Sequence, residues 1–310
     1  MESTENHGPE PRDQEPPEQT DATILAELVE KIHQEFPDLQ FSEARLEKEG
    51  LDNFVVVLDE EWVFRFPRIE KYVKLFSREV QLLKIIKDKV PVAVPDYEYL
   101  SKENEFGGYR MIKGGELTYE IFKNLPKDVK EKIAQQLGEF LSALHNLPSE
   151  AITDNHIWRT PVFFEKRYYT NRRTIFAENT TPDLLKRIDD FYEKFKKIEF
   201  PSNRVIHADL SSRHMLISPE KTSISGIIDF GEMSFADPAD DFYGFWSYGE
   251  DFLKEVLQHY TPEKDDDLID RSHLYFVRYL VDRLYRKYDW GQDPKEAEHL
   301  LEEHLSKIGC

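Results

Sequence analysis

The chain has 310 residues, enough for two modest domains, and its 39% hydrophobic and 13% aromatic content supports a sizeable core. Its 41 basic and 61 acidic residues give a net charge of −20, which argues against nucleic acid as a main partner because phosphate binding needs a basic face. The same charge suits a cationic substrate, although solubility is the commoner reason for it.

The sequence also argues against membrane insertion and secretion. No run of about 18 apolar residues is present, and the start, MESTENHGPEPRDQ, lacks the basic and apolar regions of a secretory signal. The only cysteine is Cys310, so no disulfide can form within the chain. We therefore expect a cytoplasmic protein without membrane or nucleic-acid partners, and we expect it to be a monomer.

Residues 1–20 differ in composition from the rest of the chain. They contain four prolines, six acids and no apolar residue after Met1. Such a segment buries too little surface to offset the entropy lost on ordering, so we expect a disordered tail.

Residues 21–112 are expected to form a first lobe. Apolar residues at helical spacing predict a helix over 22–36, with Asp21 as its cap. Residues 43–66 change to short runs rich in Val and Phe and broken by turn residues, which is typical of antiparallel strands. The lobe is completed by a predicted helix over 73–89 and strands at 95–101 and 107–114.

Residues 113–310 are expected to form a second, mainly helical lobe. Two short apolar runs, 215–218 and 226–229, predict a small central hairpin. Amphipathic patterns predict helices at 129–147, 184–198, 240–246, 250–260 and 272–288. The predicted fold class is therefore α+β, with a small antiparallel-sheet lobe followed by a helical one.

The most informative stretch is a loop within residues 205–218, VIHADLSSRHMLIS. Asp209 stands where a carboxylate can align an acceptor hydroxyl and take its proton during phosphoryl transfer. An isolated Asp here could simply cap a turn; the Asp-Phe-Gly that follows in segment 226–241 favours the catalytic interpretation. His207 is expected to brace the loop through a backbone hydrogen bond.

Two residues are candidates for holding Mg²⁺. Asp229 ends an apolar strand, and its carboxylate suits a hard cation that bridges nucleotide phosphates. His214 stands where the kinase loop has Asn; imidazole is softer, but it can bind Mg²⁺ weakly or hold a metal-bound water. The alternative is a zinc or iron hydrolase site, which would need more His and Asp ligands nearby.

Arg65 and Glu79 are the candidate pair for the nucleotide phosphates. Arg65 stands on a strand and Glu79 on the following helix, where kinases place a Lys and its partner Glu. Arg68 and Arg78 are rivals, and two unrelated surface residues are the alternative. The turn 50–53 is a candidate phosphate cover through the side chain of Asn53, although a plain hairpin turn explains it as well.

Two groups of acids follow the Asp-Phe-Gly. Asp237 and Asp241 are expected to support the catalytic loop or cap the next helix. Glu232, Glu250 and Asp251 are candidates for gripping a cationic substrate, and a solvated acidic face explains them equally well.

Together these residues resemble the aminoglycoside phosphotransferases, antibiotic kinases with a protein-kinase-like fold. The resemblance covers roughly residues 22–260 and is carried by FRFPR, REVQLLK, LGEFLSALHNL, HADLSSRHML, IIDFGE and ADPADDF. The chain is most similar to the 2″-phosphotransferase branch, in which a D-x-S-S-x-H-x-L loop with His in place of Asn also looks usual.

The resemblance implies two lobes with ATP or GTP between them, the first binding the nucleotide. It implies Mg²⁺ at His214 and Asp229, with Asp209 facing the acceptor, and a nucleotide base that pairs with the backbone around Arg110 and Ile112. The implied activity is transfer of the γ-phosphate to an aminoglycoside hydroxyl, which confers antibiotic resistance.

Three departures from that branch leave the acceptor open. Arg65 replaces the usual Lys, Glu232 stands where Asp is usual, and the stretch 244–252 is shorter and less acidic. The remaining hypotheses are a kinase of another small molecule, such as a macrolide or a metabolite, and a catalytically dead kinase fold that serves as a binding module.

Overall fold

The computed structural model describes residues 20–47, 52–148, 166–168 and 172–310. The chain divides into two compact units, Met1–Phe76 with Tyr97–Met111 and Ser77–Asp96 with Ile112–Cys310. Apart from Thr20, the predicted tail lies outside the described residues.

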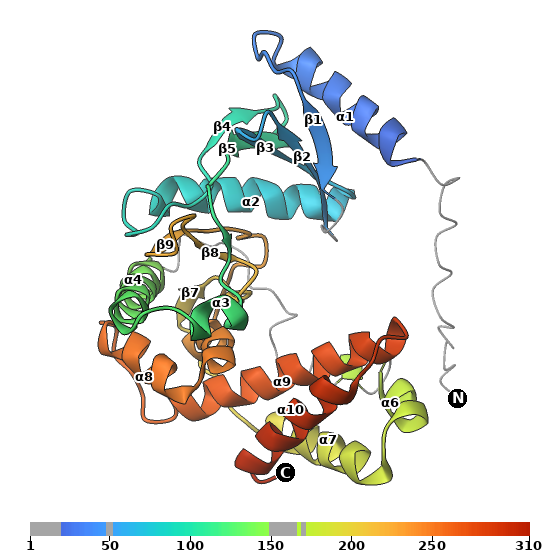
Figure 1. The fold of residues 1–310 in the computed structure, drawn as a ribbon, viewed down its shortest axis with the longest axis vertical. Coiled ribbons are helices and arrows are strands. Elements are labelled where there is room, and N and C mark those ends of the chain that lie inside the picture. Colours follow the sequence, from blue (N-terminus) through green and yellow to red (C-terminus); the bar gives the residue numbers. More distant parts are fainter. Residues whose placement is uncertain (1–19, 48–51, 149–165, 169–171) are drawn as a thin grey trace, which may run out of the picture. The chain divides into compact units, whose positions relative to one another are not determined.

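The first unit is built on a five-stranded sheet in the order β1-β2-β3-β5-β4, in which every neighbouring pair is antiparallel (Figure 1). The strands are β1 Ala44–Glu47, β2 Asn53–Leu58, β3 Trp62–Pro67, β4 Tyr97–Leu100 and β5 Gly107–Arg110. The antiparallel sheet predicted for this part of the chain is confirmed.

Helix α1, Asp21–Glu35, packs its apolar side against this sheet. Side chains of a strand alternate between its two faces, so one face of β2 and β3 supplies every second residue to the shared core. The buried cluster comprises Leu28, Ile32, Leu39, Val56, Leu58, Trp62, Phe64, Phe66 and Phe106. Arg65, between two of these phenylalanines in sequence, therefore belongs to the opposite face of β3.

The prediction that Asp21 caps α1 is wrong, because the cap is one residue earlier. Thr20 has an extended backbone, and its Oγ1 accepts a hydrogen bond from the Thr23 N–H at 3.3 Å. Asp21 is instead the first helical residue, where its negative charge still favours the helix N-terminus.

Gly108 on β5 shows how tightly this core is packed. A Cβ at this position would lie 2.5 Å from the Phe64 ring, so only glycine leaves room for this ring against β5.

The second unit is mainly helical. Its helices are α3 Tyr119–Lys123, α4 Lys127–His145, α6 Arg173–Asn179, α7 Pro182–Phe195, α8 Glu250–Gln258, α9 Leu268–Asp289, α10 Lys295–Lys307 and the 3₁₀ helix η3 Pro238–Tyr248. Helix α2, Glu70–Ile86, begins in the first unit and ends in the second. None of the helices within the described residues is long and apolar enough to cross a membrane.

Two small antiparallel sheets stand among these helices. One has the order β6-β8-β9 and the other pairs β7 with β10. Their strands are β6 Gly115–Glu116, β7 Arg204–Ile206, β8 Met215–Ile217, β9 Ile224–Ile227 and β10 Ser234–Ala236. The predicted hairpin corresponds to β8 and β9, and the α+β fold class is confirmed.

Residues 77–96, which sequence patterns place in the first lobe, group with the second unit. The N–H of Ile227 donates to the carbonyl of Ala93 at 2.9 Å, and Arg78 Nη2 donates to the carbonyl of Met233 at 2.8 Å. These bonds attach the middle of α2 to the turn before β10 and the segment after α2 to β9.

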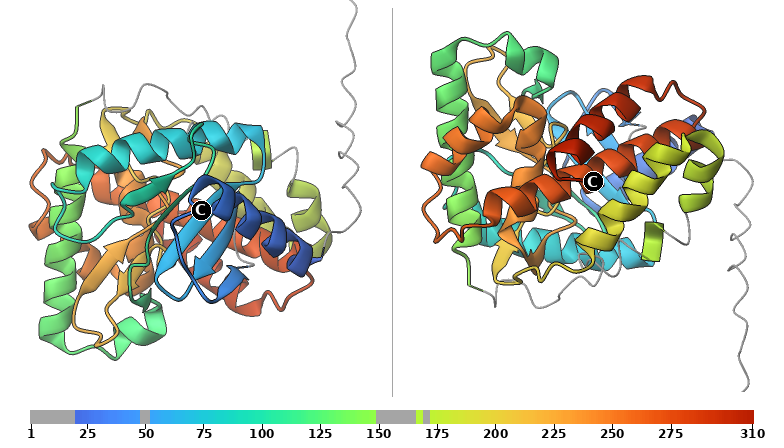
Figure 2. Two further views of the ribbon diagram at one scale, coloured as in Figure 1. Left: turned by 90° about the horizontal axis from the view of Figure 1, so that it is seen from above. Right: turned by 90° about the horizontal axis from the view of Figure 1, so that it is seen from below.

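The helical part differs from the prediction in the form of residues 240–246 and in three further helices, α3, α6 and α10. Residues 240–246 lie in a 3₁₀ helix, which suits a segment that begins with Asp237 and Pro238 and buries nearly all of its side chains. Helix α10 was not predicted; it lies along α9, and the two are seen side by side in Figure 2.

A buried pair of histidines joins α9 to α10. His273 Nε2 lies 2.7 Å from His304 Nδ1, and the His273 ring stacks on Trp246 with 4.0 Å between centroids. Burial, followed by nearby positive charge such as that of Lys307, lowers the pKa of both imidazoles to about 4.

We expect the free energy of unfolding to fall as the pH drops from about 6.5 toward about 4. The unfolded chain takes up protons on these histidines near pH 6.5, whereas the folded chain keeps them neutral until about pH 4. Denaturant unfolding across this window measures the loss. The variant His273→Gln/His304→Gln should lose part of the pH dependence; a variant with the full native dependence would contradict this origin.

Candidate active site

The predicted catalytic loop follows β7, and one buried carboxylate holds its first residues in place. Asp241 in η3 accepts hydrogen bonds from the N–H of His207 at 2.8 Å and from the N–H of Ala208 at 2.7 Å. Ala208 has φ 69°, a left-handed conformation that is uncommon for a residue with a Cβ. The two bonds stabilise this turn, so the direction of the loop depends on Asp241.

Asp241 is itself held by helix α4. His145 Nε2 lies 3.0 Å from Asp241 Oδ2, and His145 Nδ1 lies 2.8 Å from the Tyr260 hydroxyl. A carboxylate only accepts, so Nε2 carries the hydrogen and, in a neutral ring, Nδ1 accepts from Tyr260. Burial raises the pKa of Asp241, but the hydrogen bonds that its carboxylate accepts from His145 and from the backbone N–H of His207 oppose burial, and that pKa stays below its ordinary value.

His207 is fully buried and bonded at both ring nitrogens. Nε2 donates to the carbonyl of Ile228 at 3.1 Å, and Nδ1 accepts from the N–H of Asp209 at 3.3 Å. Burial lowers the pKa of His207, which favours this neutral ring. The imidazole thereby links the loop to the residue before Asp229, and it has no ring nitrogen left for proton transfer.

Asp209 presents its carboxylate to the outside of the loop. Its side chain is 43% exposed, and Oδ1 accepts a hydrogen bond from the Tyr243 hydroxyl at 3.0 Å. Its backbone carbonyl accepts from the N–H of Ser211 at 2.9 Å and lies 2.6 Å from His214 Nδ1. The backbone is thus held from several sides while the carboxylate faces outward.

The structure brings His214 and Asp229 together. His214 Nδ1 must donate to the Asp209 carbonyl, because a carbonyl only accepts, and in a neutral imidazole this leaves the lone pair on Nε2. Nε2 lies 3.4 Å from Asp229 Oδ2. Two electron-donating atoms face each other at this distance, an arrangement that a cation between them would stabilise.

The turn after Asp229 adds a further acid. Asp229 has φ 66°, again left-handed. A Cβ at Gly231 would lie 3.7 Å from Asp229 Oδ1 and 3.9 Å from Oε2 of Glu79, whose side chain is almost fully buried. The carboxylates of Glu79 and Asp229 therefore approach the same turn.

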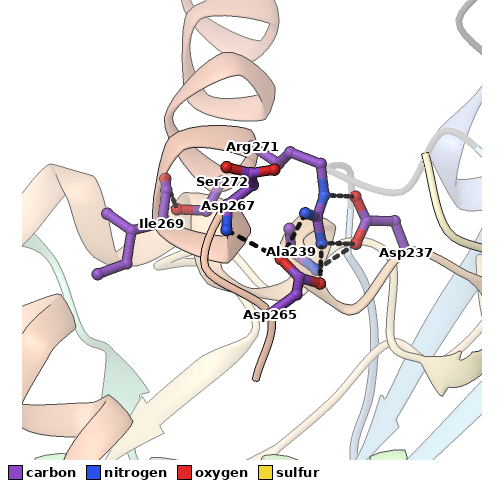
Figure 3. Close-up of polar contacts among 7 residues, drawn as sticks. All are labelled: Asp237, Ala239, Asp265, Asp267, Ile269, Arg271 and Ser272. Atoms are coloured by element: carbon purple, nitrogen blue, oxygen red, sulfur yellow. Dashed lines mark hydrogen bonds and ion pairs between the residues drawn. The ribbon is translucent and has the colours of Figure 1, made fainter. Parts of the chain in front are cut away.

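Asp237 fixes the start of η3 through Arg271 on α9 (Figure 3). Arg271 donates to Asp237 from Nε at 2.8 Å and from Nη2 at 3.1 Å, and its Nη1 donates to Asp265 at 2.7 Å. Asp237 also accepts from the N–H of Ala239 at 3.0 Å, as a helix cap does. The predicted support residues thus lie at both ends of one short segment that leads to Asp241.

The remaining nucleotide candidates are placed separately in the two units. Arg65 is buried on β3, Asn53 begins β2, and Arg110 ends β5 with its guanidinium 4.4 Å from the Trp62 ring centroid. In the second unit, Ile112 packs against Gly226, where a Cβ would lie 2.7 Å from its side chain.

Three nucleotide contacts stay predictions. They are the Arg65–Glu79 ion pair, the contact of the base with the backbone around Arg110 and Ile112, and the phosphate cover at Asn53. Residues 50 and 51 of that turn lie outside the described part of the chain.

The predicted substrate acids lie at two places. Glu232 is half-buried in the turn after the Asp-Phe-Gly. Glu250 and Asp251 begin α8, and Glu250 Oε1 lies 2.7 Å from Lys254 Nζ, whose hydrogen bond lowers the Glu250 pKa. A neighbouring lysine on the same helix therefore already balances the charge of Glu250.

Sequence reasoning missed four residues that hold the site: His145, Tyr243, Tyr260 and Arg271. Only His145 carried a usable signal, because it continues the apolar stripe of Leu137 and Leu141 on its helix. Tyr243 and Tyr260 looked like ordinary core aromatics, and Arg271 gains its partners only when α9 packs on η3.

Comparison with known proteins places the chain in a family. The model of the phosphotransferase enzyme family matches residues 43–275, about three quarters of the chain. The chain belongs to this family. Its relative YcbJ, an uncharacterized protein of Bacillus subtilis strain 168, is 24% identical over 260 residues, which cover 76% of this chain and 81% of the relative.

Solved structures of the same fold extend the comparison. APH(2″)-IIIa in complex with GDP and kanamycin superposes with a TM-score of 0.76 at 26% identity, covering 91% of this chain and 99% of the other. A macrolide 2′-phosphotransferase type I gives 0.63 at 23% identity, covering 91% and 98%, and supports the fold alone. The resemblance to aminoglycoside phosphotransferases is confirmed, as is the enzyme class, a phosphotransferase with a hydroxyl acceptor.

We expect Asp241→Asn to destabilise the second unit by about 3 kcal/mol, because it removes one partner from a buried charged network. Asp266→Asn, at an exposed position, is the matched control and should cost less than about 0.5 kcal/mol. Denaturant unfolding at neutral pH compares the two. Equal stabilities would show that Asp241 does not hold the loop as described.

Proposed function

We propose that this protein transfers the γ-phosphate of ATP or GTP to a hydroxyl group of an aminoglycoside, as a 2″-like kinase that confers resistance. The observation that carries the proposal is the arrangement of Asp209, His214 and Asp229. The carboxylate of Asp209 faces outward beside the His214 imidazole, and Nε2 of that imidazole lies 3.4 Å from Asp229 Oδ2. Kinase chemistry needs such an acceptor-side carboxylate next to a metal-binding pair.

Asp209 carries the acceptor chemistry. Its carboxylate aligns the acceptor hydroxyl and takes the hydroxyl proton as the acceptor oxygen bonds to the γ-phosphorus. The bond from that phosphorus to the bridging oxygen breaks, and the nucleoside diphosphate leaves. His207 takes no part in this transfer, because both of its ring nitrogens are bonded within the loop.

His214 and Asp229 fit a magnesium ion. Mg²⁺ keeps several waters and is bound through one or two protein groups plus substrate phosphates, so two ligands suffice. His214 meets the usual requirement for a metal-binding histidine, since its other nitrogen donates to a backbone carbonyl. When bound, Mg²⁺ would neutralise charge on the phosphates.

A hydrolase of the zinc or iron type would need a different set of side chains. Such sites have three or four protein ligands. Within the part of the chain that the structure describes, no group of three His, Cys, Asp or Glu side chains is arranged to hold a metal. The donor set therefore favours a phosphotransferase site.

Arg65, Glu79, Asn53, Arg110 and Ile112 are the residues we assign to the nucleotide. Arg65 is proposed to reach the α- and β-phosphates, with Glu79 holding it, and the backbone around Arg110 and Ile112 to pair with the base. The positions of Arg65 on β3 and Glu79 on α2 support this role, because kinases place the equivalent pair on a strand and on the helix that follows it.

Aminoglycosides are the first candidate acceptors because APH(2″)-IIIa was solved with GDP and kanamycin, and this chain matches 99% of its length. Glu232, Glu250 and Asp251 are the acids proposed to bind the amines of such an acceptor. The net charge of −20 favours the approach of a polycation.

A kinase of a less cationic acceptor is the second candidate. Glu250 is paired with Lys254, Asp240 lies 3.4 Å from Arg278, and Asp237 is paired with Arg271. Acids neutralised within the protein attract amines weakly. The shared fold with a macrolide phosphotransferase makes macrolides the natural comparison.

We expect purified protein with Mg²⁺ and ATP or GTP to release nucleoside diphosphate when an acceptor is added. Kanamycin, gentamicin and erythromycin form the panel, and mass spectrometry of the acceptor detects the added phosphate. Phosphorylated kanamycin or gentamicin supports the first candidate, and phosphorylated erythromycin alone supports the second. Nucleotide binding without turnover on any acceptor would indicate the binding-module hypothesis.

Asp209→Asn should lower kcat by a hundredfold or more, on the order of a lost general base, while nucleotide affinity stays within about twofold. Asp266→Asn serves again as the control for a lost surface charge. Steady-state kinetics and nucleotide titration measure both quantities. A fully active Asp209→Asn enzyme would remove Asp209 from the mechanism.

Removal of divalent cations by EDTA should abolish turnover, and Mg²⁺ should restore it. His214→Asn should keep Mg²⁺-dependent nucleotide binding, because the amide oxygen replaces the imidazole with a harder ligand, whereas His214→Ala should weaken it about tenfold or more. Calorimetric titration with Mg²⁺ and a non-hydrolysable nucleotide compares the variants. Equal binding by both would place the metal elsewhere.

A further inference from the structure

We propose that Tyr243 is a positioning residue for Asp209: it holds one carboxylate oxygen so that the other faces the acceptor hydroxyl. The inference rests on the proposed phosphotransfer at Asp209. The Tyr243 hydroxyl donates to Asp209 Oδ1 at 3.0 Å. An exposed carboxylate can rotate and present either oxygen, and this bond selects one orientation.

The tyrosine is well suited to hold another side chain in place. It lies in η3 with only 3% of its surface exposed, and its ring packs against Tyr279 with 5.4 Å between centroids. Burial and the charge of Asp209 raise the pKa of Tyr243 well above its ordinary value. The hydroxyl therefore keeps its proton and acts as a donor throughout the range of an assay.

The backbone on either side of Tyr243 is tied to the catalytic loop. Asp241 binds the N–H groups of His207 and Ala208. On the other side, a Cβ at Gly244 would lie 2.2 Å from the carbonyl oxygen of Leu210, so only glycine permits this approach. Because Asp241 and Gly244, which flank Tyr243 in the sequence, both contact the loop, the fold fixes the position of Tyr243 relative to Asp209.

The second carboxylate oxygen of Asp209, Oδ2, is the one available to the acceptor hydroxyl. Asp209 Oδ2 lies 3.6 Å from His214 Nδ1, beyond hydrogen-bond distance, and that nitrogen already donates to the Asp209 backbone carbonyl. We therefore assign Oδ2 as the oxygen that meets the acceptor hydroxyl and receives its proton. Tyr243 touches neither the acceptor nor the nucleotide in this account; it acts through Asp209.

Tyr243→Phe tests the inference because it removes only the hydroxyl. We expect kcat to fall about tenfold or more, with the KM values for nucleotide and acceptor nearly unchanged. Tyr248→Phe is the matched control: Tyr248 lies in the same helix and donates its hydroxyl to the carbonyl of Leu117, away from Asp209. It should lose a similar amount of thermal stability and keep its kcat.

A double-mutant cycle separates positioning from a purely structural role. On the residual rate of Asp209→Asn, Tyr243→Phe should have no further effect, because its influence passes through the missing carboxylate. The acceptors are kanamycin and erythromycin, with hydrolysis of Mg·ATP or Mg·GTP by water as a third readout.

The outcomes distinguish this inference from the function on which it rests. Equal kcat values for Tyr243→Phe and Tyr248→Phe, or additive effects in the cycle, would overturn the role of Tyr243 and leave the phosphotransferase intact. A native protein without turnover on either acceptor or water would overturn the proposed function and this inference with it.

Discussion

The buried carboxylate of Asp241 connects the parts of the second unit that build the site. Burial of a carboxylate away from water raises the free energy of the folded state by several kcal/mol unless hydrogen-bond donors surround it. Asp241 gains them from the two N–H groups that begin the catalytic loop and from His145 on α4, which is backed in turn by Tyr260. The loop therefore has its shape because a helix distant in sequence satisfies this charge through His145, and Tyr260, which follows α8, holds His145 in turn.

Several features of the site follow from this one constraint. The left-handed turn at Ala208 is tolerated because its N–H is bonded, and the turn aims Asp209 outward. His207, kept neutral by burial, bonds to the carbonyl before Asp229 and so relates the loop to the Asp-Phe-Gly turn. Arg271 holds Asp237 at the other end of the segment that carries Asp241. Loss of the central charge would loosen all of these at once.

Much of this could be predicted from the sequence because its signals are local. The loop around Asp209, the strand that ends at Asp229 and the alternation of apolar residues in 53–66 are all legible within a few neighbouring residues. Those signals predicted the fold class, the reaction class and the pairing of His214 with Asp229.

The supporting residues could not be predicted in the same way. The bond from Tyr243 to Asp209 spans 34 residues, and the bond from His145 to Asp241 spans 96. Such partners are chosen by packing and not by local sequence pattern. The 3₁₀ form of residues 238–248 has the same origin, since the sequence pattern predicted a helix over 240–246 but carried no signal for its 3₁₀ form. The error at Asp21 was smaller: Thr20 and Asp21 are both good caps, and backbone geometry decides between them.

The net charge of the chain and its local ion pairs give opposite indications about the acceptor. The chain is strongly acidic, yet acids after the Asp-Phe-Gly are paired with Arg271, Arg278 and Lys254. Long-range attraction of a cation and local binding of its amines are thus separate properties here. In the proposed function, the loop and the pair His214 and Asp229 carry the reaction, whereas groups around them select the acceptor.

The central claim is that His214, Asp229 and Asp209 form one phosphotransfer site. A crystal structure with Mg²⁺ and a non-hydrolysable ATP or GTP analogue tests it most directly. We expect a metal bound by His214 Nε2 and an Asp229 oxygen together with the nucleotide phosphates, and Asp209 Oδ2 facing the γ-phosphate. A metal bound by other side chains, or a nucleotide whose γ-phosphate lies away from Asp209, would contradict it.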